Sequence, residues 1–323
     1  MTELPALSRR SLLLAAPALF APRAFAQAFP VRPVTLICPF STGGTADVQL
    51  RVLAAAASKA LGQPIVVDTR AGAAGTLGPA SLLNQPPDGY TLSMATGVAL
   101  LRQPFIQPTR YDPARDFTYI TGVTKFELGL AVRSDAPWAN LADLIDYAKR
   151  NPGKLSYGTA GAATAQHTAM LKLCDATGID AVHVPFKGSG EVFNALSGGH
   201  VQAISETSGW APLVDSGKFR LLAVYSEKRL KRWPTVPTLR EQGHDIAEAV
   251  PWGIVGPAGM DPRVVERLNA AFRQGLADPS FVKTLDLLGQ EPWGLEPRAY
   301  RDYMVARIPV ERELVAKYRL KER

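Results

Sequence analysis

Residues 34–47 read Val-Thr-Leu-Ile-Cys-Pro-Phe-Ser-Thr-Gly-Gly-Thr-Ala-Asp, and this stretch decides the fold class. The apolar, β-branched run at 34–40 predicts a buried strand. Residues 47–61 are rich in alanine and leucine at helical spacing, so the glycine-containing turn joins a strand to a helix. A strand that passes directly into a helix begins the alternation typical of α/β proteins.

The same alternation continues along the chain. The further predicted strands are 65–69, 90–96, 128–132, 155–159, 182–185, 201–205, 221–225 and 252–255. The further predicted helices are 76–84, 141–150, 164–177, 191–197, 262–276, 279–288 and 297–318. We therefore expect an α/β protein in which helices cover parallel sheets.

Composition and charge limit the kinds of partner and cofactor that the protein is expected to bind. The 323 residues carry a net charge of +7 but no Lys/Arg-rich run with interleaved aromatic residues, so small anions are favoured over nucleic acid as partners. Two cysteines without a C-x-x-C spacing and four scattered histidines predict no metal site, and no cofactor is expected. Cys38 and Cys174 are expected to be buried free thiols, with a disulfide as the alternative.

The first 26 residues have the parts of an export signal. Arg9 and Arg10 precede an apolar stretch at 12–20 that is too short to span a bilayer, and Ala24-Phe25-Ala26 offers a cleavage site. We expect a signal peptide at 1–26, cleaved before Gln27, and a periplasmic protein. The arginine pair favours the twin-arginine route. The alternatives are an ordinary secretory signal and an uncleaved anchor.

Three turns rich in small and hydroxyl residues follow predicted strands, at 40–47, 71–76 and 159–164. Small side chains let the backbone approach a ligand, and free N–H groups at a helix start bind anions. Ligands of open α/β sheets bind at the carboxyl ends of strands. Each turn alone is a weak signal, because neither the dinucleotide-binding pattern nor a P-loop lysine is present.

Eight short blocks in a fixed order carry a stronger signal, at 39–47, 62–68, 70–75, 87–92, 151–155, 183–188, 234–238 and 252–259. Together they resemble the extracytoplasmic solute-binding receptors of tripartite tricarboxylate transporters, the Bug-type proteins. The resemblance implies a two-domain α/β fold of the periplasmic-binding-protein type II kind, each domain a mainly parallel sheet flanked by helices, with the ligand cleft between them. We expect domain 1 at 27–125 and 227–323, and domain 2 at 126–226.

The resemblance also implies how a small organic acid is held. Receptors of this family bind ligand carboxylates mainly through backbone N–H groups, hydroxyls and ordered water. The first turn and the 159–164 turn would then hold the ligand from opposite domains. The expected ligand-binding residues are Phe40, Ser41, Thr42, Gly43, Gly44, Thr45, Ala73, Gly75, Thr159, Ala160, Gly161, Ala162, Ala163, Thr164, His167, Lys187, Glu206 and Thr207.

Two positions depart from the family pattern. Thr45-Ala46 stands where a third glycine is usual, and Glu206 stands where aspartate is frequent. In the cleft, Glu206 would accept a hydrogen bond from a ligand amine or amide, or would repel a second carboxylate; a solvated surface position is the alternative. Lys187 is the best charged candidate near the cleft, and a solvated loop position is its alternative.

The sequence thus favours a monomeric receptor that captures a small carboxylate, including an amino or aromatic acid, for the membrane components of a tripartite transporter. An α/β hydrolase or transferase would need a positioned nucleophile and base, and the chain has no G-x-S-x-G motif. His167 and Cys174 lie seven residues apart on one predicted helix, about 10 Å, which is too far for proton transfer. A sensor subunit of a membrane kinase is a further alternative, because the same closure would serve it.

Overall fold

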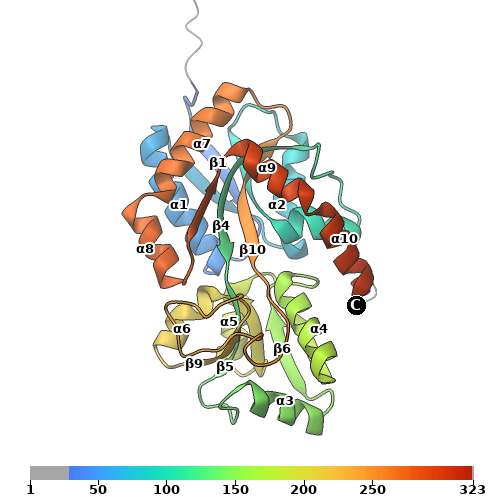
Figure 1. Cartoon of the computed structure of the whole chain (residues 1–323). Helices are drawn as coiled ribbons and strands as arrows, with labels where there is room; N and C mark the ends of the chain where they lie inside the picture. Colours follow the sequence, from blue (N-terminus) through green and yellow to red (C-terminus); the bar gives the residue numbers. More distant parts are fainter. Residues whose placement is uncertain (1–28, 322–323) are drawn as a thin grey trace, which may run out of the picture.

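The computed structural model describes residues 29–321, so the predicted export signal lies outside the described residues. Two β-sheets flanked by helices form an upper and a lower lobe (Figure 1). The expected α/β architecture of two helix-covered sheets is confirmed. Within 29–321, every helix is too short or too polar to cross a membrane.

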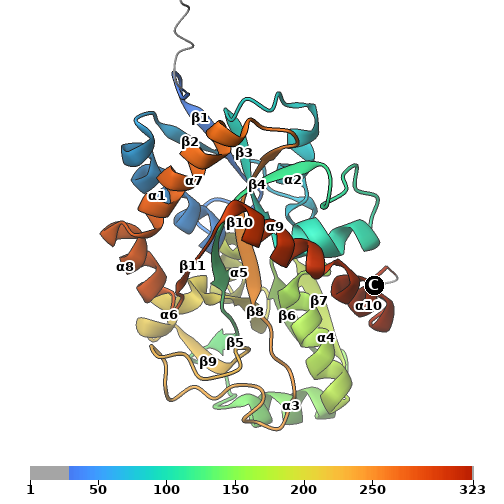
Figure 2. The same ribbon diagram turned by 45° about the horizontal axis from the view of Figure 1, so that its top comes forward.

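The upper lobe contains the six-stranded sheet. In order across the sheet, its strands are β11 (Pro292–Leu295), β4 (Phe117–Phe126), β10 (Val250–Pro257), β3 (Thr91–Thr96), β1 (Val34–Cys38) and β2 (Ile65–Thr69). Its helices are α1 (Thr45–Leu61), α2 (Leu77–Ser81), α7 (Pro262–Leu276), α8 (Pro279–Leu287), α9 (Pro297–Ala306) and α10 (Ile308–Lys317). Helices α1, α7 and α8 pack together at one side of the sheet, and α2 and α9 lie at the other (Figures 1 and 2).

The lower lobe contains the five-stranded sheet. In order across the sheet, its strands are β7 (Ala181–Pro185), β6 (Leu155–Thr159), β8 (Ala203–Thr207), β5 (Leu128–Arg133) and β9 (Phe219–Val224). Its helices are α3 (Leu141–Arg150), α4 (Ala165–Thr177), α5 (Ser189–Ser197) and α6 (Ala211–Asp215). Strand β6 is parallel to β7 and β8, whereas β5 is antiparallel to β8 and β9.

The pairing is more mixed than the mainly parallel sheets that we expected. In the upper sheet, β1 is parallel to β2 and β3, but β10 is antiparallel to β3 and β4, and β11 is antiparallel to β4. The physical reason is the way the chain crosses between lobes. Strand β4 leads down into β5, and β10 brings the chain back up, so these strands need no helical crossover and run opposite to their neighbours (Figure 1).

Clear capping signals explain the elements that the sequence located well. Asn140 accepts a hydrogen bond from the backbone N–H of Asp143 and starts α3 at the predicted residue. Thr164 accepts from His167 N and starts α4, which ends at Gly178 in the left-handed conformation, with φ 71°. Local hydrogen-bonding chemistry therefore sets these boundaries.

Three expectations were wrong in detail. The predicted helix at 297–318 is two helices, because Pro309 lacks the N–H of a continuous helix and its ring clashes with the preceding turn. The predicted helix at 76–84 is a short α2 flanked by 3-10 turns. Cys174 is only partly buried where it packs against the edge of the core, while Cys38 is buried, and no disulfide joins the two.

A shared hydrophobic core and a buried arginine are among the connections that join the lobes. Phe126, at the end of β4, stacks on Trp252 of β10 with ring centroids 5.7 Å apart, within a hydrophobic core that continues from one lobe to the other. Arg102 of the upper lobe is buried, and its Nε donates to Glu311 Oε2 of α10 at 2.6 Å. The Arg102 Nη1 also donates to Thr168 Oγ1 of α4 at 3.0 Å. A single guanidinium therefore connects α10 to a helix of the lower lobe.

Candidate functional site

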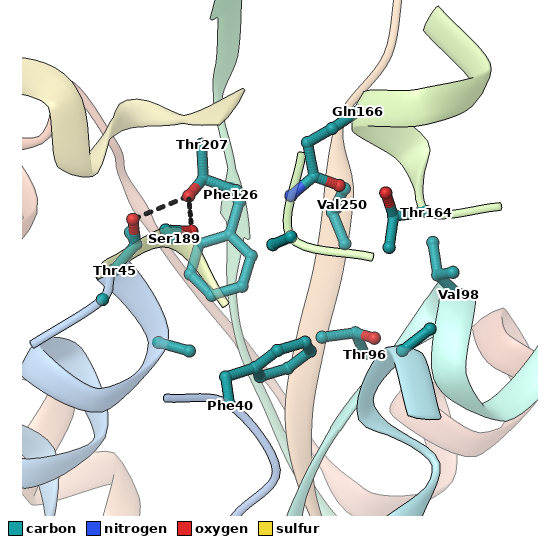
Figure 3. Close-up of a pocket in the computed structure, with 14 residues that line it drawn as sticks. Phe40, Thr45, Thr96, Val98, Phe126, Thr164, Gln166, Ser189, Thr207 and Val250 are labelled. Carbon is teal, nitrogen blue, oxygen red and sulfur yellow. Dashed lines mark hydrogen bonds between the residues drawn. The ribbon is translucent and has the colours of Figure 1, made fainter. Parts of the chain in front are cut away.

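A pocket lies between the two lobes (Figure 3). Side chains and backbone from both sheets line it: Phe40, Gly44, Thr45, Ala46, Ala74, Thr96, Val98, Phe126, Ala160, Thr164, Gln166, Ser189, Thr207 and Val250. None of these 14 described residues carries a charged side chain. The cavity has a volume of about 30 Å³. The lobes are therefore close together around a narrow space.

Three helices begin at this pocket. Thr45 is the first residue of α1, Thr164 caps α4, and Ser189 is the first residue of α5. The first N–H groups of a helix have no acceptor within the helix, and the helix dipole gives that end a partial positive charge. Three such ends around one cavity are suited to bind an anion without a charged side chain.

Hydroxyl groups connect the lobes across the pocket. The Oγ1 atoms of Thr45 and Thr207 lie 2.6 Å apart, and Ser189 Oγ lies 3.2 Å from Thr207 Oγ1 (Figure 3). The backbones also approach closely, since a Cβ placed on Gly44 would lie 3.1 Å from Gly190 N. Glycine at position 44 therefore permits the start of α1 to contact the start of α5.

Glu206 is fully buried behind the lower wall of the pocket. Its carboxylate accepts hydrogen bonds from Ala160 N at 2.7 Å, Ser189 Oγ at 2.6 Å and Thr207 N at 2.8 Å. Burial raises the pKa of Glu206, and these hydrogen bonds oppose that rise. The solvated-surface alternative is wrong. Glu206 positions three residues of the wall and does not itself line the pocket.

Two stacked imidazoles support the 159–164 turn. His167 Nδ1 accepts from Ala163 N at 2.9 Å, and its ring lies 3.8 Å from the ring of His183 between centroids. His183 Nε2 lies 2.7 Å from Thr159 Oγ1. Burial lowers the pKa of His183 to about 4, so this ring is neutral near neutral pH. The pair orders the turn from behind.

The 18 residues predicted from the sequence divide into three groups. Six line the pocket: Phe40, Gly44, Thr45, Ala160, Thr164 and Thr207. Five line a neighbouring cavity farther out between the lobes: Ala73, Gly161, Ala162, Ala163 and Lys187. Seven lie outside both linings: Ser41, Thr42, Gly43, Gly75, Thr159, His167 and Glu206. Ala74, with φ 51°, lies in the pocket between the predicted Ala73 and Gly75.

Sequence reasoning missed several lining residues, namely Ala46, Ala74, Thr96, Val98, Phe126, Gln166, Ser189 and Val250. Ser189 had a usable signal, since it is a hydroxyl residue that follows Gly188 at a helix start. Thr96 had another, because it ends β3 with a hydroxyl at the carboxyl edge of the sheet. Phe126 and Val250 had no local signal, because only the crossing between lobes brings them to the cleft.

Comparisons with known proteins identify a family for this chain. The family model described as "Tripartite tricarboxylate transporter family receptor" matches residues 49–320. A protein of Cupriavidus necator, described as the UPF0065 protein in gbd 5'region, is 39% identical over 295 residues. That match covers 91% of this chain and 90% of the relative.

Solved structures show the same fold. The periplasmic binding protein BugD superposes with a TM-score of 0.86 at 30% identity, covering 90% of this chain and 99% of BugD. A Rhodopseudomonas palustris protein solved with adipate gives 0.85 at 30% identity, with coverages of 90% and 98%. MatC of the same species, solved with malate, gives 0.83 at 28% identity, with coverages of 89% and 100%.

Proposed function

The chain belongs to the tripartite tricarboxylate transporter receptor family, and from this we propose that it captures a small organic carboxylate in the periplasm for the membrane components of such a transporter. The observation that carries the proposal is the convergence of three helix starts on a pocket between the lobes. Backbone N–H groups at helix starts bind anions without a cationic side chain. The malate and adipate in the two related structures are carboxylates as well.

We propose that the ligand contacts the pocket-lining residues directly, with Gly44, Thr45, Thr164 and Ser189 placing the N–H donors. The other residues predicted from the sequence either support these donors or reach the ligand through ordered water. Glu206 and His167 are supports of this kind, since their side chains hold the backbone of the 160–163 segment.

We propose that the two lobes close on the ligand about the two crossing segments. One crossing lies where β4 ends at Phe126. The other lies at the start of β10, at Val250, rather than at 226–227, because the chain after β9 still packs on the lower sheet: Thr238 bridges Val224, and Trp233 contacts Trp210. A ligand that touches both walls makes more contacts when the lobes are closed than when they are open, so it stabilises the closed arrangement. Small-angle scattering should therefore give a smaller radius of gyration with ligand than without.

The export of the protein and its lack of catalysis are further parts of the proposal. Cleavage before Gln27 is checked by amino-terminal sequencing of the periplasmic form, and a start more than a few residues away contradicts it. Of the described groups, His167 would be a candidate base, but its Nδ1 already accepts from Ala163 N. Incubation with a bound acid, followed by mass spectrometry, should recover the acid unchanged.

A matched thermal-shift screen tests the receptor function. The protein, refolded from denaturant to remove any bound ligand, is heated with carboxylic acids and with the neutral amides of the same acids. An acid at about 100 times its Kd should add roughly 2.7 kcal/mol of stability. The amide should add little, because it lacks the charge that helix starts favour. Equal stabilisation by acid and amide, or none by any acid, contradicts the proposal.

A further inference from the structure

We propose that the ligand is a carboxylate that has no amino group and whose body is apolar. This inference rests on the proposed receptor function and narrows it to a chemical class. The pocket offers positive helix ends at its rim and hydrocarbon surface at its walls, and its lining contains no charged side chain among the described residues. An alkanoate or an aromatic carboxylate matches both parts of that surface.

The walls of the pocket present aromatic and aliphatic surface beside the hydroxyl and amide groups. The rings of Phe40 and Phe126 face the cavity from one side, and the side chains of Val98 and Val250 face it from the other (Figure 3). Phe126 is held in place by its stack on Trp252. A hydrocarbon chain or ring buried between these groups loses contact with water, which favours binding. A polyhydroxylated body would lose hydrogen bonds to water there instead.

An ammonium group finds no anionic partner in this pocket. Glu206, the acid behind the wall, has its oxygens occupied by four protein donors: Ala160 N, Ser189 Oγ, and both N and Oγ1 of Thr207. Thr164 Oγ1 donates to Gly161 O and accepts from His167 N, and Thr96 Oγ1 accepts from Ala99 N. A cation in the pocket would lose its hydration and would face three positive helix ends.

Binding to matched acids that differ only in the α-amino group tests this inference. The pairs are glutarate and glutamate, 4-methylpentanoate and leucine, and 3-phenylpropanoate and phenylalanine, measured by titration calorimetry on refolded full-length protein. In each pair that binds, the acid without the amino group should bind at least about 100-fold more tightly, or about 2.8 kcal/mol. Butanoate should likewise bind at least about tenfold more tightly than 3,4-dihydroxybutanoate.

A pair of variants checks the physical cause. Gln166→Glu places a carboxylate in the pocket lining, so the preference against the amino acid should fall at least about tenfold. Gln166→Leu adds no charge and should keep the full preference. If an amino acid binds the original protein within tenfold of the matched acid without the amino group, this inference is overturned while the receptor proposal stands. The same holds if 3,4-dihydroxybutanoate binds more tightly than butanoate. If no acid of any pair binds, the receptor proposal itself fails.

Discussion

The two walls of the pocket hold their backbone donors by different means. The upper wall depends on backbone conformation: Gly44 allows the close approach, Ala74 is left-handed, and Gly43 N donates to Asp47 Oδ2 at 3.0 Å. The lower wall depends on ionisable side chains behind it: the buried Glu206, and the buried His167 stacked on the partly buried His183. Larger side chains in the upper wall should therefore disturb the pocket. In the lower wall, the loss of a hydrogen-bond acceptor or a change of pH should disturb it.

The largest expected effect is that of Gly44→Val on ligand affinity. Its Cβ would lie 3.1 Å from Gly190 N and 3.4 Å from Ser189 N, so a branched side chain blocks the approach of α5. We expect affinity to fall about 100-fold, or about 2.8 kcal/mol, in a folded protein. Calorimetry measures the affinity.

The matched control is Gly43→Val. Gly43 has φ 77° and open space around its Cβ position, so the change strains the backbone without a clash. It should cost about 1–2 kcal/mol of stability and leave affinity within about threefold. If Gly44→Val leaves the ligand affinity unchanged, ligand binding does not depend on the contact between the starts of α1 and α5.

Glu206→Gln tests the lower wall. The amide keeps one acceptor oxygen, so either Ala160 N or the donors on Ser189 and Thr207 lose their partner. We expect a loss of about 1–3 kcal/mol in the free energy of unfolding, measured in urea. The same change at exposed Glu191 should cost less than about 0.5 kcal/mol. Undiminished stability with improved dicarboxylate binding would instead assign Glu206 a repulsive role.

A pH effect of the lower wall should come from His183. Its pKa is lowered from 6.5 to about 4 in the folded protein, so between these values the unfolded chain binds more protons. Stability should therefore fall as the pH drops through this window. We expect about 1–2 kcal/mol, discounted because the ring is partly solvated. Urea unfolding at several pH values should show a shallower decline for His183→Gln, and equal slopes would refute the assignment.

The smallest expected effect lies on the upper wall, at Ala73. Its φ of 46° is unfavourable for an L-residue, and Ala73→Gly relieves that strain while adding chain entropy to the unfolded state. The net change should be a gain of about 0.5 kcal/mol. Ala55→Gly, in the exposed middle of α1, should instead lose about 1 kcal/mol. A loss at both positions would mean that the turn stores no strain.

Fold prediction succeeded where the signal was local. α3, β6 and α7 have the predicted bounds, since caps and periodic apolar residues mark them. β4 was not predicted, because it is buried nearly throughout and shows no clear alternation. The antiparallel position of β10 depends on the crossing between lobes, and no local pattern encodes that crossing.

Site prediction shows the same division. The hydroxyl and glycine turns indicated Thr45 and Thr164, which line the pocket, because a helix start carries its own anion-binding chemistry. The position of Glu206 behind the wall could not be predicted, since Ala160 and Ser189, which donate to its carboxylate, come from separate segments of the lower lobe. Long-range packing decided which polar residues face the cavity and which support it.

Arg102 links the carboxyl-terminal helix α10 to the position of the lower lobe, because the same guanidinium donates hydrogen bonds to Glu311 of α10 and to Thr168 of α4. No residue of α10 is among those that line the pocket in the described part of the chain. Substitutions in α10 can therefore change the resting angle between the lobes and leave the chemistry of the cavity intact. Through this helix, evolution can retune how tightly the receptor retains its cargo without altering which cargo it selects.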